Sequence, residues 1–244
     1  MKLKHFLLYA MGILIPTTVF SAEYYVVPGL RSTGNDGSSW EKAITMYDVF
    51  ENDASAAKND EVSKYKTGDV FFLAGGTYYN ATSPSADAGR IYRGYVFVGG
   101  CDQSKGAVTE WPAYPSATPT IFSGDLDENG GPSAGDLRNL IHVRQARNDD
   151  AENLAHICRL IGIDFTCSYS PEGSTNASGA VYCTQGAIEL QYCNIYNNVS
   201  KGEGAGDGIG AGIHIYGGLL SYKRLQCIQQ QSAQDRSRIP LYHP

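Results

Sequence analysis

The chain has 244 residues, of which 42% are hydrophobic and 11% aromatic, and its formal net charge is −6. This length and apolar content suit one substantial domain with a buried core, and they exclude an intrinsically disordered protein. The acidic balance, without a basic cluster, argues against nucleic acid or an anionic membrane surface as the partner. The 28 glycines and 17 tyrosines favour turns and strands over helices.

Residues 1–22 are typical of a secretory signal peptide. Lys2 and Lys4 precede an apolar run from Phe6 to Phe20, and the small residues Ser21 and Ala22 follow it. This order of charge, apolar segment and small-residue cleavage site marks a signal peptide. A transmembrane anchor is the alternative, for which a run of about 15 residues is short. The mature protein is therefore expected to be secreted or held at the cell surface or cell outer membrane, with no transmembrane span.

A helix is predicted from about residue 38 to residue 57. Ser38 and Glu41 have the spacing of a capping box at its start. Apolar residues then recur at steps of three or four, which is the helical period. These residues are Trp40, Ala43, Tyr47, Phe50, Ala54 and Ala57.

The other predicted elements are short strands, which glycine, asparagine, aspartate, serine or proline usually separates. Many short strands with one early helix indicate an all-β domain, and leave a sandwich, a propeller or a solenoid open. The predicted strands are Tyr24–Val27, Val70–Leu73, Tyr95–Val98, Thr120–Phe122, Leu140–Val143, Leu160–Phe165, Ala187–Leu190, Asn194–Tyr196 and Gly212–Tyr216.

Two internal repeats favour the solenoid. Ile163–Phe165 matches Cys193–Ile195, with apolar, polar and apolar side chains in the same order. Gly179–Tyr182 resembles Gly212–Tyr216 when Gly179 is aligned with Gly212. Units near this length, with short strands and bends, are typical of the coils of a parallel β-solenoid, in which equivalent residues stack on one another.

The motifs of the chain also resemble a known group of proteins. "YYVVPGLRSTGNDGSSWEKAIT", "GDVFFLAGGTYY", "YVFVGGCD", "PTIFSGDLDENGG" and "NLIHV" follow one another in order. "SGAVYCTQGAIELQYCNIYNN" (Ser178–Asn198) and "GAGIHIYGG" (Gly210–Gly218) come next. This series resembles secreted right-handed parallel β-helix proteins with the pectate-lyase-like fold, including repeat proteins of the polymorphic outer-membrane-protein type.

The resemblance covers about Glu23 to Gly218. It implies an all-β fold, a right-handed parallel β-helix domain over residues 23–218 with an N-terminal capping helix. Residues 219–244 do not continue the motif, because they lack glycine and are rich in glutamine between Gln226 and Gln234. We expect an atypical tail there, as in an altered solenoid or a truncated form of a longer protein.

Proteins of this group include adhesins as well as enzymes that act on acidic polysaccharides. The favoured function is a non-catalytic interaction or adhesive role, with glycans or cell-surface proteins as partners. The alternative is a polysaccharide lyase or glycoside hydrolase that acts on acidic glycans.

Lyases on this fold need several carboxylates for calcium and a basic residue. The aligned outward positions offer only Asp164 and the amide Asn194, so no catalytic, cofactor or metal residue is assigned. Candidate bases are Arg90, Arg93, Arg144 and Arg159.

The densest acidic segment is "SGDLDENGG", with Asp125, Asp127 and Glu128. Clustered carboxylates can hold calcium or act as acid and base, and the spacing matches part of an EF-hand loop. Asp136 stands where an EF-hand has its closing glutamate, and no flanking helices are evident. A calcium site therefore stays an alternative to a solvated turn. No motif supports Asp125 and Asp164 as a hydrolase dyad.

The stretch Gly202–Gly218 contains Gly206–Ala211, which matches the dinucleotide fingerprint G-x-G-x-x-A. No helix pattern follows it, so no nucleotide is expected. Glu203 and Ala205 replace glycines that a calcium nonapeptide requires. We expect a corner between coils instead.

Three further sets of residues have a structural and a functional interpretation. His142 and His214 are expected to be structural or surface residues. Six tyrosines are candidates for a sugar-stacking surface or for packing, namely Tyr24, Tyr25, Tyr78, Tyr79, Tyr92 and Tyr95. Six cysteines are expected to be buried thiols or to form at least one disulfide, namely Cys101, Cys158, Cys167, Cys183, Cys193 and Cys227.

Overall fold

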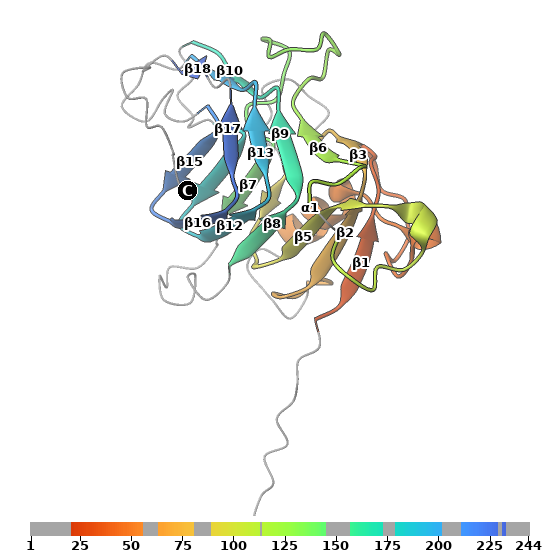
Figure 1. Ribbon diagram of the computed structural model, residues 1–244. Coiled ribbons are helices and arrows are strands. Elements are labelled where there is room, and N and C mark those ends of the chain that lie inside the picture. The colour runs from red at the N-terminus through yellow and green to blue at the C-terminus, as the bar shows by residue number, and fades with distance from the viewer. Residues whose placement is uncertain are drawn as a thin grey trace, which may run out of the picture.

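The computed structural model describes residues 21–55, 63–80, 89–112, 114–144, 157–172, 179–201, 211–228 and 231–232. Within these ranges the chain is mostly β, as predicted, and its strands form several parallel sheets (Figure 1). The predicted signal peptide lies outside the described residues except for its last two positions. No helix in the described ranges is long and apolar enough to cross a lipid bilayer.

Four sheets make up the described structure, and every strand pairs with its neighbours in parallel. The first sheet has the order β1 (Glu23–Val26), β2 (Val70–Ala74), β5 (Val96–Cys101), β8 (Cys158–Ile161), β12 (Ala187–Gln191) and β16 (Leu219–Lys223). The second has the order β3 (Gly76–Tyr78), β6 (Thr120–Ser123), β9 (Ile163–Thr166), β13 (Asn194–Tyr196) and β17 (Gln226–Ile228).

The third sheet has the order β4 (Arg90–Ile91), β7 (Ile141–Arg144), β11 (Val181–Thr184) and β15 (Ile213–Tyr216). The fourth is short, with β10 (Tyr169–Ser170), β14 (Val199–Ser200) and β18 (Gln231–Ser232). The helical elements are η1 (Trp40–Lys42), α1 (Met46–Ser55) and η2 (Gln103–Lys105).

The chain visits the sheets in a fixed order. From β8 it passes to β9, β10 and β11, and then returns to the first sheet at β12, beside β8. We call one such passage a coil. The next coil runs through β12, β13, β14 and β15, and returns to the first sheet at β16. This path is consistent with a parallel β-solenoid.

The strand registers test the two predicted repeats. Asp164 pairs with Asn194, so the alignment of the first repeat is confirmed. The alignment of Gly179 with Gly212 would place Val181 beside His214, whereas Val181 pairs with Ile213 and Tyr182 with His214. The second prediction was therefore wrong by one position. Such a slip exchanges the inward and outward faces of a strand, so it would have moved His214 off the column of Tyr182.

The bends between sheets recur at equivalent positions. Gly162, Tyr192 and Arg224 follow β8, β12 and β16, and all three have positive φ, at 65°, 54° and 51°. Cys167 and Asn197 repeat the feature after the second sheet, with φ of 58° and 55°. Non-glycine residues rarely adopt this left-handed conformation, which costs about 1–2 kcal/mol each. The coil stacking therefore imposes these bends on the chain.

The core lies between the first three sheets. Its inward positions stack in columns, because residues that pair across parallel strands lie above one another. In the first sheet, Tyr24, Phe71 and Phe97 form one column, with ring centroids 5.3 and 5.1 Å apart. Leu160 and Leu190 continue it and are fully buried. A buried aromatic ring removes a large apolar area from water, so these columns stabilise the stack.

A second apolar cluster lies on the outer face of the first sheet, around Tyr25, Phe72 and Val98. The segment that follows β5 covers it. Trp40 packs edge-on against Tyr25, at 4.7 Å between ring centroids, and its Nε1 donates to the carbonyl of Gly106 at 2.8 Å. The first sheet is thus buried on both faces near its N-terminal edge, and the outer segment is held in place.

The predicted helix is shorter than expected, and its capping box was wrong. The Ser38 hydroxyl donates to Asp36 at 2.6 Å and does not cap a helix. The backbone at Ile44 is instead extended and bonds to the carbonyl of Tyr25 at 3.0 Å, which interrupts the helical pattern. Helix α1 begins at Met46, where the Asp48 carboxylate accepts a bond from the backbone N–H of Thr45 at 2.9 Å.

Helix α1 occupies a place that a strand has in later coils. It follows β1, precedes β2 and packs beside β4, the N-terminal edge strand of the third sheet. Its buried residues Met46, Val49 and Phe50 join the main core. Gly89 meets this helix closely, because a Cβ at that position would lie 1.9 Å from Cγ of Phe50. The helix therefore covers the core at this edge, as expected of a cap.

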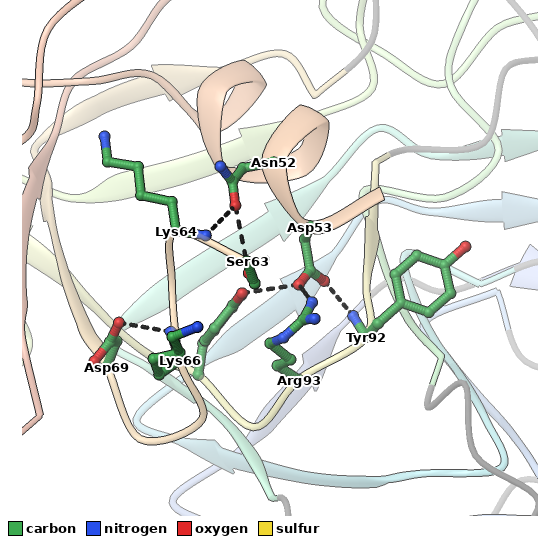
Figure 2. Close-up of polar contacts among 9 residues, drawn as sticks. Asn52, Asp53, Ser63, Lys64, Lys66, Asp69, Tyr92 and Arg93 are labelled. Carbon is green, nitrogen blue, oxygen red and sulfur yellow. Dashed lines mark hydrogen bonds and ion pairs between the residues drawn. The ribbon is translucent and has the colours of Figure 1, made fainter. Parts of the chain in front are cut away.

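A buried ion pair fastens α1 to the chain before β5 (Figure 2). The Asp53 carboxylate, on the last turn of the helix, is 0% exposed. It accepts hydrogen bonds from the backbone N–H of Tyr92, the guanidinium of Arg93 and, at 2.8 Å, the hydroxyl of Tyr95. Burial raises the pKa of Asp53 from its ordinary value, and the three donors oppose this. The pair fixes the position of the helix.

The strand pattern continues past Gly218, where the sequence predicted an atypical tail in the form of an altered or truncated solenoid. Strands β16, β17 and β18 pair in register with β12, β13 and β14. Main-chain bonds to an existing coil need no glycine or strict alternation, which explains why the composition misled us. The side chains of β16 and β17 are poorly covered, with Leu219 56% and Ile228 52% exposed.

Replacement of Asp53 by alanine should destabilise the protein strongly, because Arg93 would keep a buried charge without its carboxylate. We expect a loss of about 3–5 kcal/mol in the free energy of unfolding, measured by urea denaturation. Glu172→Ala is the control, since Glu172 is exposed to solvent. Equal stabilities of the two variants would contradict this account of the ion pair.

Candidate functional site

A groove of about 390 Å³ runs over the outer face of the second sheet. Its floor consists of Asp164, Asn194 and Gln226, which occupy equivalent positions on β9, β13 and β17. Its wall comes from the segment between β5 and β6, and its edge from the bends between the first and second sheets. The remaining lining residues are Tyr114, Pro115, Ser116, Pro119, Gly162, Tyr192 and Arg224.

The floor of the groove is a polar ladder. The prediction that Asp164 and Asn194 share one outward column is confirmed by their register. Asn194 Nδ2 donates to Asp164 Oδ1 at 2.7 Å. Burial raises the pKa of the Asp164 carboxyl from its ordinary value, and the bonds from Asn194 oppose this. Gln226 adds a second amide, because it pairs with Asn194 in the last described coil.

The edge of the groove is an aromatic stack above the bends. The Tyr114 ring takes the space that a side chain at Gly162 would need, since a Cβ there would lie 1.7 Å from Cε1 of Tyr114. Tyr114 stacks on Tyr192 with 5.3 Å between centroids and 18° between planes. Lys223 and Arg224 place cations over Tyr192, at 5.4 and 5.6 Å from the ring centre. Such cation–π contacts stabilise the stack.

The groove can bind a ligand through polar and aromatic contacts. Its volume lies within the range of about 300–1,000 Å³ that is usual for ligand pockets. Among the described residues that line it, Asp164 is the one carboxylate and Arg224 the one guanidinium. Sequence reasoning missed Tyr114, Tyr192 and Arg224. The number of residues per coil is the one sequence signal that could have shown that Tyr192 and Arg224 occupy equivalent bends.

The four arginines considered as bases do not line this groove. Arg93 is buried in the ion pair with Asp53, and Arg159 pairs with Glu189 at 2.7 Å on the first sheet. Arg90 and Arg144 lie on β4 and β7 of the third sheet. None of them is therefore placed to act beside Asp164.

The acidic segment after β6 forms a compact cluster. Carboxylate oxygens of Asp125, Asp127 and Asp136 lie within 4.8 Å of one another, so these residues could hold a cation. Each accepts bonds from its own loop, as when Asp127 accepts from the Ser133 hydroxyl at 2.7 Å and Asp136 from the Ser133 N–H at 2.6 Å. Glu128, the third predicted acid, is exposed and outside the cluster. Asp125 does not line the groove, so a dyad with Asp164 is not assembled there.

The two histidines considered in the sequence, His142 and His214, lie in one column of the third sheet. Tyr182 lies between them, with centroids 4.4 Å from His142 and 5.2 Å from His214. His142 is 4% and His214 7% exposed, so they are structural rather than surface residues. His142 Nε2 also lies 2.9 Å from the hydroxyl of Thr184.

The tyrosines proposed for sugar stacking mostly serve the core. Tyr25, Tyr78 and Tyr95 are at most 6% exposed, so their rings are not available to a ligand. The Tyr78 hydroxyl lies 3.0 Å from the carbonyl oxygens of both Val26 and Ala74, either of which can accept its proton. Trp111, Tyr114 and Tyr192 instead border two hollows on the described part of the surface.

All six cysteines are free thiols in the structure, and all but Cys227 are buried. Burial raises the pKa of Cys183 to about 11 and that of Cys193 to about 12. The thiolate is the reactive form, so these side chains are inert packing groups. The sequence left buried thiols and a disulfide open, and the structure has free thiols, five of them buried.

The glycine-rich stretch is described only from residue 211 onward, so its fingerprint and the positions of Glu203, Ala205 and Asp207 lie outside the described residues. The corner predicted before the strand at 212–216 therefore lies outside the described residues too. The chain also bends after that strand. Gly217 has φ of 63° at the bend between β15 and β16. A Cβ at Gly218 would lie 2.4 Å from the carbonyl oxygen of Gly186, so close stacking on the previous coil requires glycine here.

Comparison of the chain with models of protein families, with curated proteins and with solved structures found no match. The resemblance to pectate-lyase-like proteins therefore stays a prediction, and the site has to be judged by its own geometry.

Replacement of Gly162 by alanine should disturb the groove and the fold together. The new Cβ would collide with Tyr114 and would also hold a strained φ, so we expect a loss of more than about 2 kcal/mol in unfolding free energy. Gly34→Ala is the matched control, because Gly34 has φ of 71° and nothing within 4 Å of its Cβ position. If both variants lost the same stability, the Tyr114 contact would be unimportant.

Asp136 should make stability depend on pH. Burial raises its pKa to about 6, and the neighbouring Asp127 and Asp125 add to this, against bonds from backbone N–H groups. Its folded pKa exceeds the ordinary value, so the folded state binds more protons between about pH 4 and pH 6. The free energy of unfolding should therefore fall as pH rises through this range.

Denaturation curves at several pH values would measure this effect, with Asp136→Asn as the comparison. The variant should lose that part of the pH dependence. An unchanged pH profile in the variant would assign the effect to other groups.

Proposed function

We propose that this chain is an exported or cell-surface right-handed parallel β-helix protein that binds glycans without cleaving them. The repeated order of sheets and the parallel registers support a β-helix with α1 as its N-terminal cap. Right-handedness follows from the general preference of parallel crossovers, about 98% of which are right-handed. Export, to the medium or the cell outer membrane, rests on the pattern of residues 1–22.

The groove on the second sheet is the proposed binding site. Sugars present hydroxyl groups and apolar C–H faces, so they need polar partners beside aromatic or aliphatic surface. The ladder of Asp164, Asn194 and Gln226 offers carboxylate and amide groups in a row. The stack of Tyr114 and Tyr192 borders it. The ladder follows the long direction of the sheet, which suits an extended chain.

The composition of the ladder carries the non-catalytic proposal. A glycoside hydrolase ordinarily uses two carboxylates about 5–9.5 Å apart, and the described lining contains one. That carboxylate already accepts a bond from Asn194. An enzyme of the lyase or hydrolase class is the alternative outcome, since Asp164 and Arg224 border the same groove.

Oligogalacturonates and cello-oligosaccharides, as acidic and neutral chains, test the proposal. We expect saturable binding by calorimetry, and no release of unsaturated or reducing sugars. Asn194→Ala should weaken binding about tenfold, because one net hydrogen bond contributes about 1 kcal/mol and the change also removes the side-chain donor to Asp164. Thr77→Ala is the matched control, because Thr77 lies on β3 of the same sheet but outside the groove lining.

Released sugar products that disappear in Asp164→Asn would replace the binding proposal with an enzyme. Absence of binding to every acidic and neutral chain would also contradict it.

A further inference from the structure

A second hollow lies beside the groove, on the outer side of the first sheet. It measures about 550 Å³ and is lined by described residues between Gly100 and Pro112 and between Pro115 and Thr118. Pro115 and Ser116 line both hollows, so the two are neighbours that share one wall. The residues of the ion pairs, core columns and left-handed bends described above do not line this hollow.

Trp111 is the main aromatic feature of the hollow. It lines the depression and is 52% exposed. The other tryptophan, Trp40, packs against Tyr25 and donates to the carbonyl of Gly106. Trp40 therefore holds the segment in place, whereas half of the Trp111 surface faces solvent. An amphipathic ring in that position is typical of a binding site.

The hollow is formed before any ligand binds, because its segment is tied down at several points. The Val108 N–H donates to the hydroxyl of Tyr25 at 3.2 Å. The Ser116 hydroxyl lies 3.0 Å from the carbonyl of Gly100 and 3.1 Å from that of Thr118. The Asp102 carboxylate accepts from the Ser104 N–H at 3.0 Å at the start of η2. A pre-formed site avoids the entropy cost of ordering on binding.

The polar groups of the hollow carry both signs of charge. Lys105, Asp102 and Glu110 line it, and no ion pair joins them to one another or to any other residue that the structure describes. An indole face beside one cation and two carboxylates suits a ligand with both C–H faces and hydroxyl groups. A phosphate-bearing ligand would need a basic cluster, and a lipid would need a lining without these charges.

We propose that Trp111 stacks on a pyranose ring of the same glycan chain that occupies the groove, with Lys105 and Glu110 binding its hydroxyl groups. The shared wall at Pro115 and Ser116 lets one chain cross from the groove to the hollow. This inference rests on the proposed function and extends it, because it names a second subsite and predicts that affinity grows with chain length.

Tryptophan fluorescence of the full chain tests the subsite directly. The chain has two tryptophans, and Trp40 donates to Gly106 at the same hollow, so an emission change on adding glycan reports on Trp111 when Trp111→Phe abolishes it. We expect long oligosaccharides from the binding panel to shift the emission to shorter wavelength. Disaccharides, which can occupy the groove alone, should give a smaller shift.

Affinity measurements on Trp111→Ala give the second readout. The variant should lose about tenfold or more in affinity for the long chains and little for disaccharides, because only long chains reach the hollow. Trp111→Phe should recover part of the loss, since it keeps an aromatic ring. Unchanged thermal unfolding would show that both variants fold, as expected for a half-exposed side chain.

The two proposals fail in different ways. If glycans bind but Trp111→Ala keeps the full affinity for long chains, the subsite is overturned and the groove stands. If no glycan binds, both proposals are overturned. If a proline-rich peptide shifts the Trp111 emission and no glycan does, the hollow is a peptide site and the carbohydrate assignment is wrong.

Discussion

Parallel pairing of each coil with the one before it is the constraint on which the rest of the structure depends. Because the register is continuous, residues one coil apart in the sequence lie above one another, as Asp164 and Asn194 do. The same register puts Phe71 over Tyr24 in the core. One set of main-chain bonds therefore decides both what is buried and what is displayed.

The bends follow from that pairing and create the groove. Each coil must turn at the same place to stay in register, so Gly162, Tyr192 and Arg224 share the left-handed conformation. Gly162 leaves room for the Tyr114 ring, and Tyr192 supplies the ring that Tyr114 stacks on. An architectural requirement, the corner, thus places aromatic and charged side chains beside the polar ladder.

The N-terminal part shows how the stack begins. Helix α1 takes the position of a strand beside β4, and the buried pair of Asp53 and Arg93 holds it there. Burying two charges is costly unless further bonds satisfy them, and here Tyr92 and Tyr95 also donate to Asp53. The segment that carries Trp111 covers the outer face of the first sheet in a similar way. Both faces near this edge are therefore buried.

Local patterns determined much of the fold. The strand content and the match between 163–165 and 193–195 are visible in the sequence because inward and outward positions alternate along each strand. The start of the helix could not be predicted from local patterns, because the extended backbone at Ile44 depends on its hydrogen bond to Tyr25, which is distant in sequence. The continuation through β16 to β18 was missed for the same reason, because main-chain pairing leaves little trace in composition.

The sequence by itself determined the mostly β character and the ladder position shared by Asp164 and Asn194, because both follow from periodicity along the chain. Only the tertiary structure decided what stands beside that ladder. Three separate segments supply Tyr114, Tyr192 and Arg224. These residues meet because the coils stack and because the Tyr114 ring fits over Gly162. Likewise, Trp111 is exposed, whereas Trp40 packs against Tyr25. This difference depends on the tertiary surroundings of each ring and not on its neighbours in the sequence.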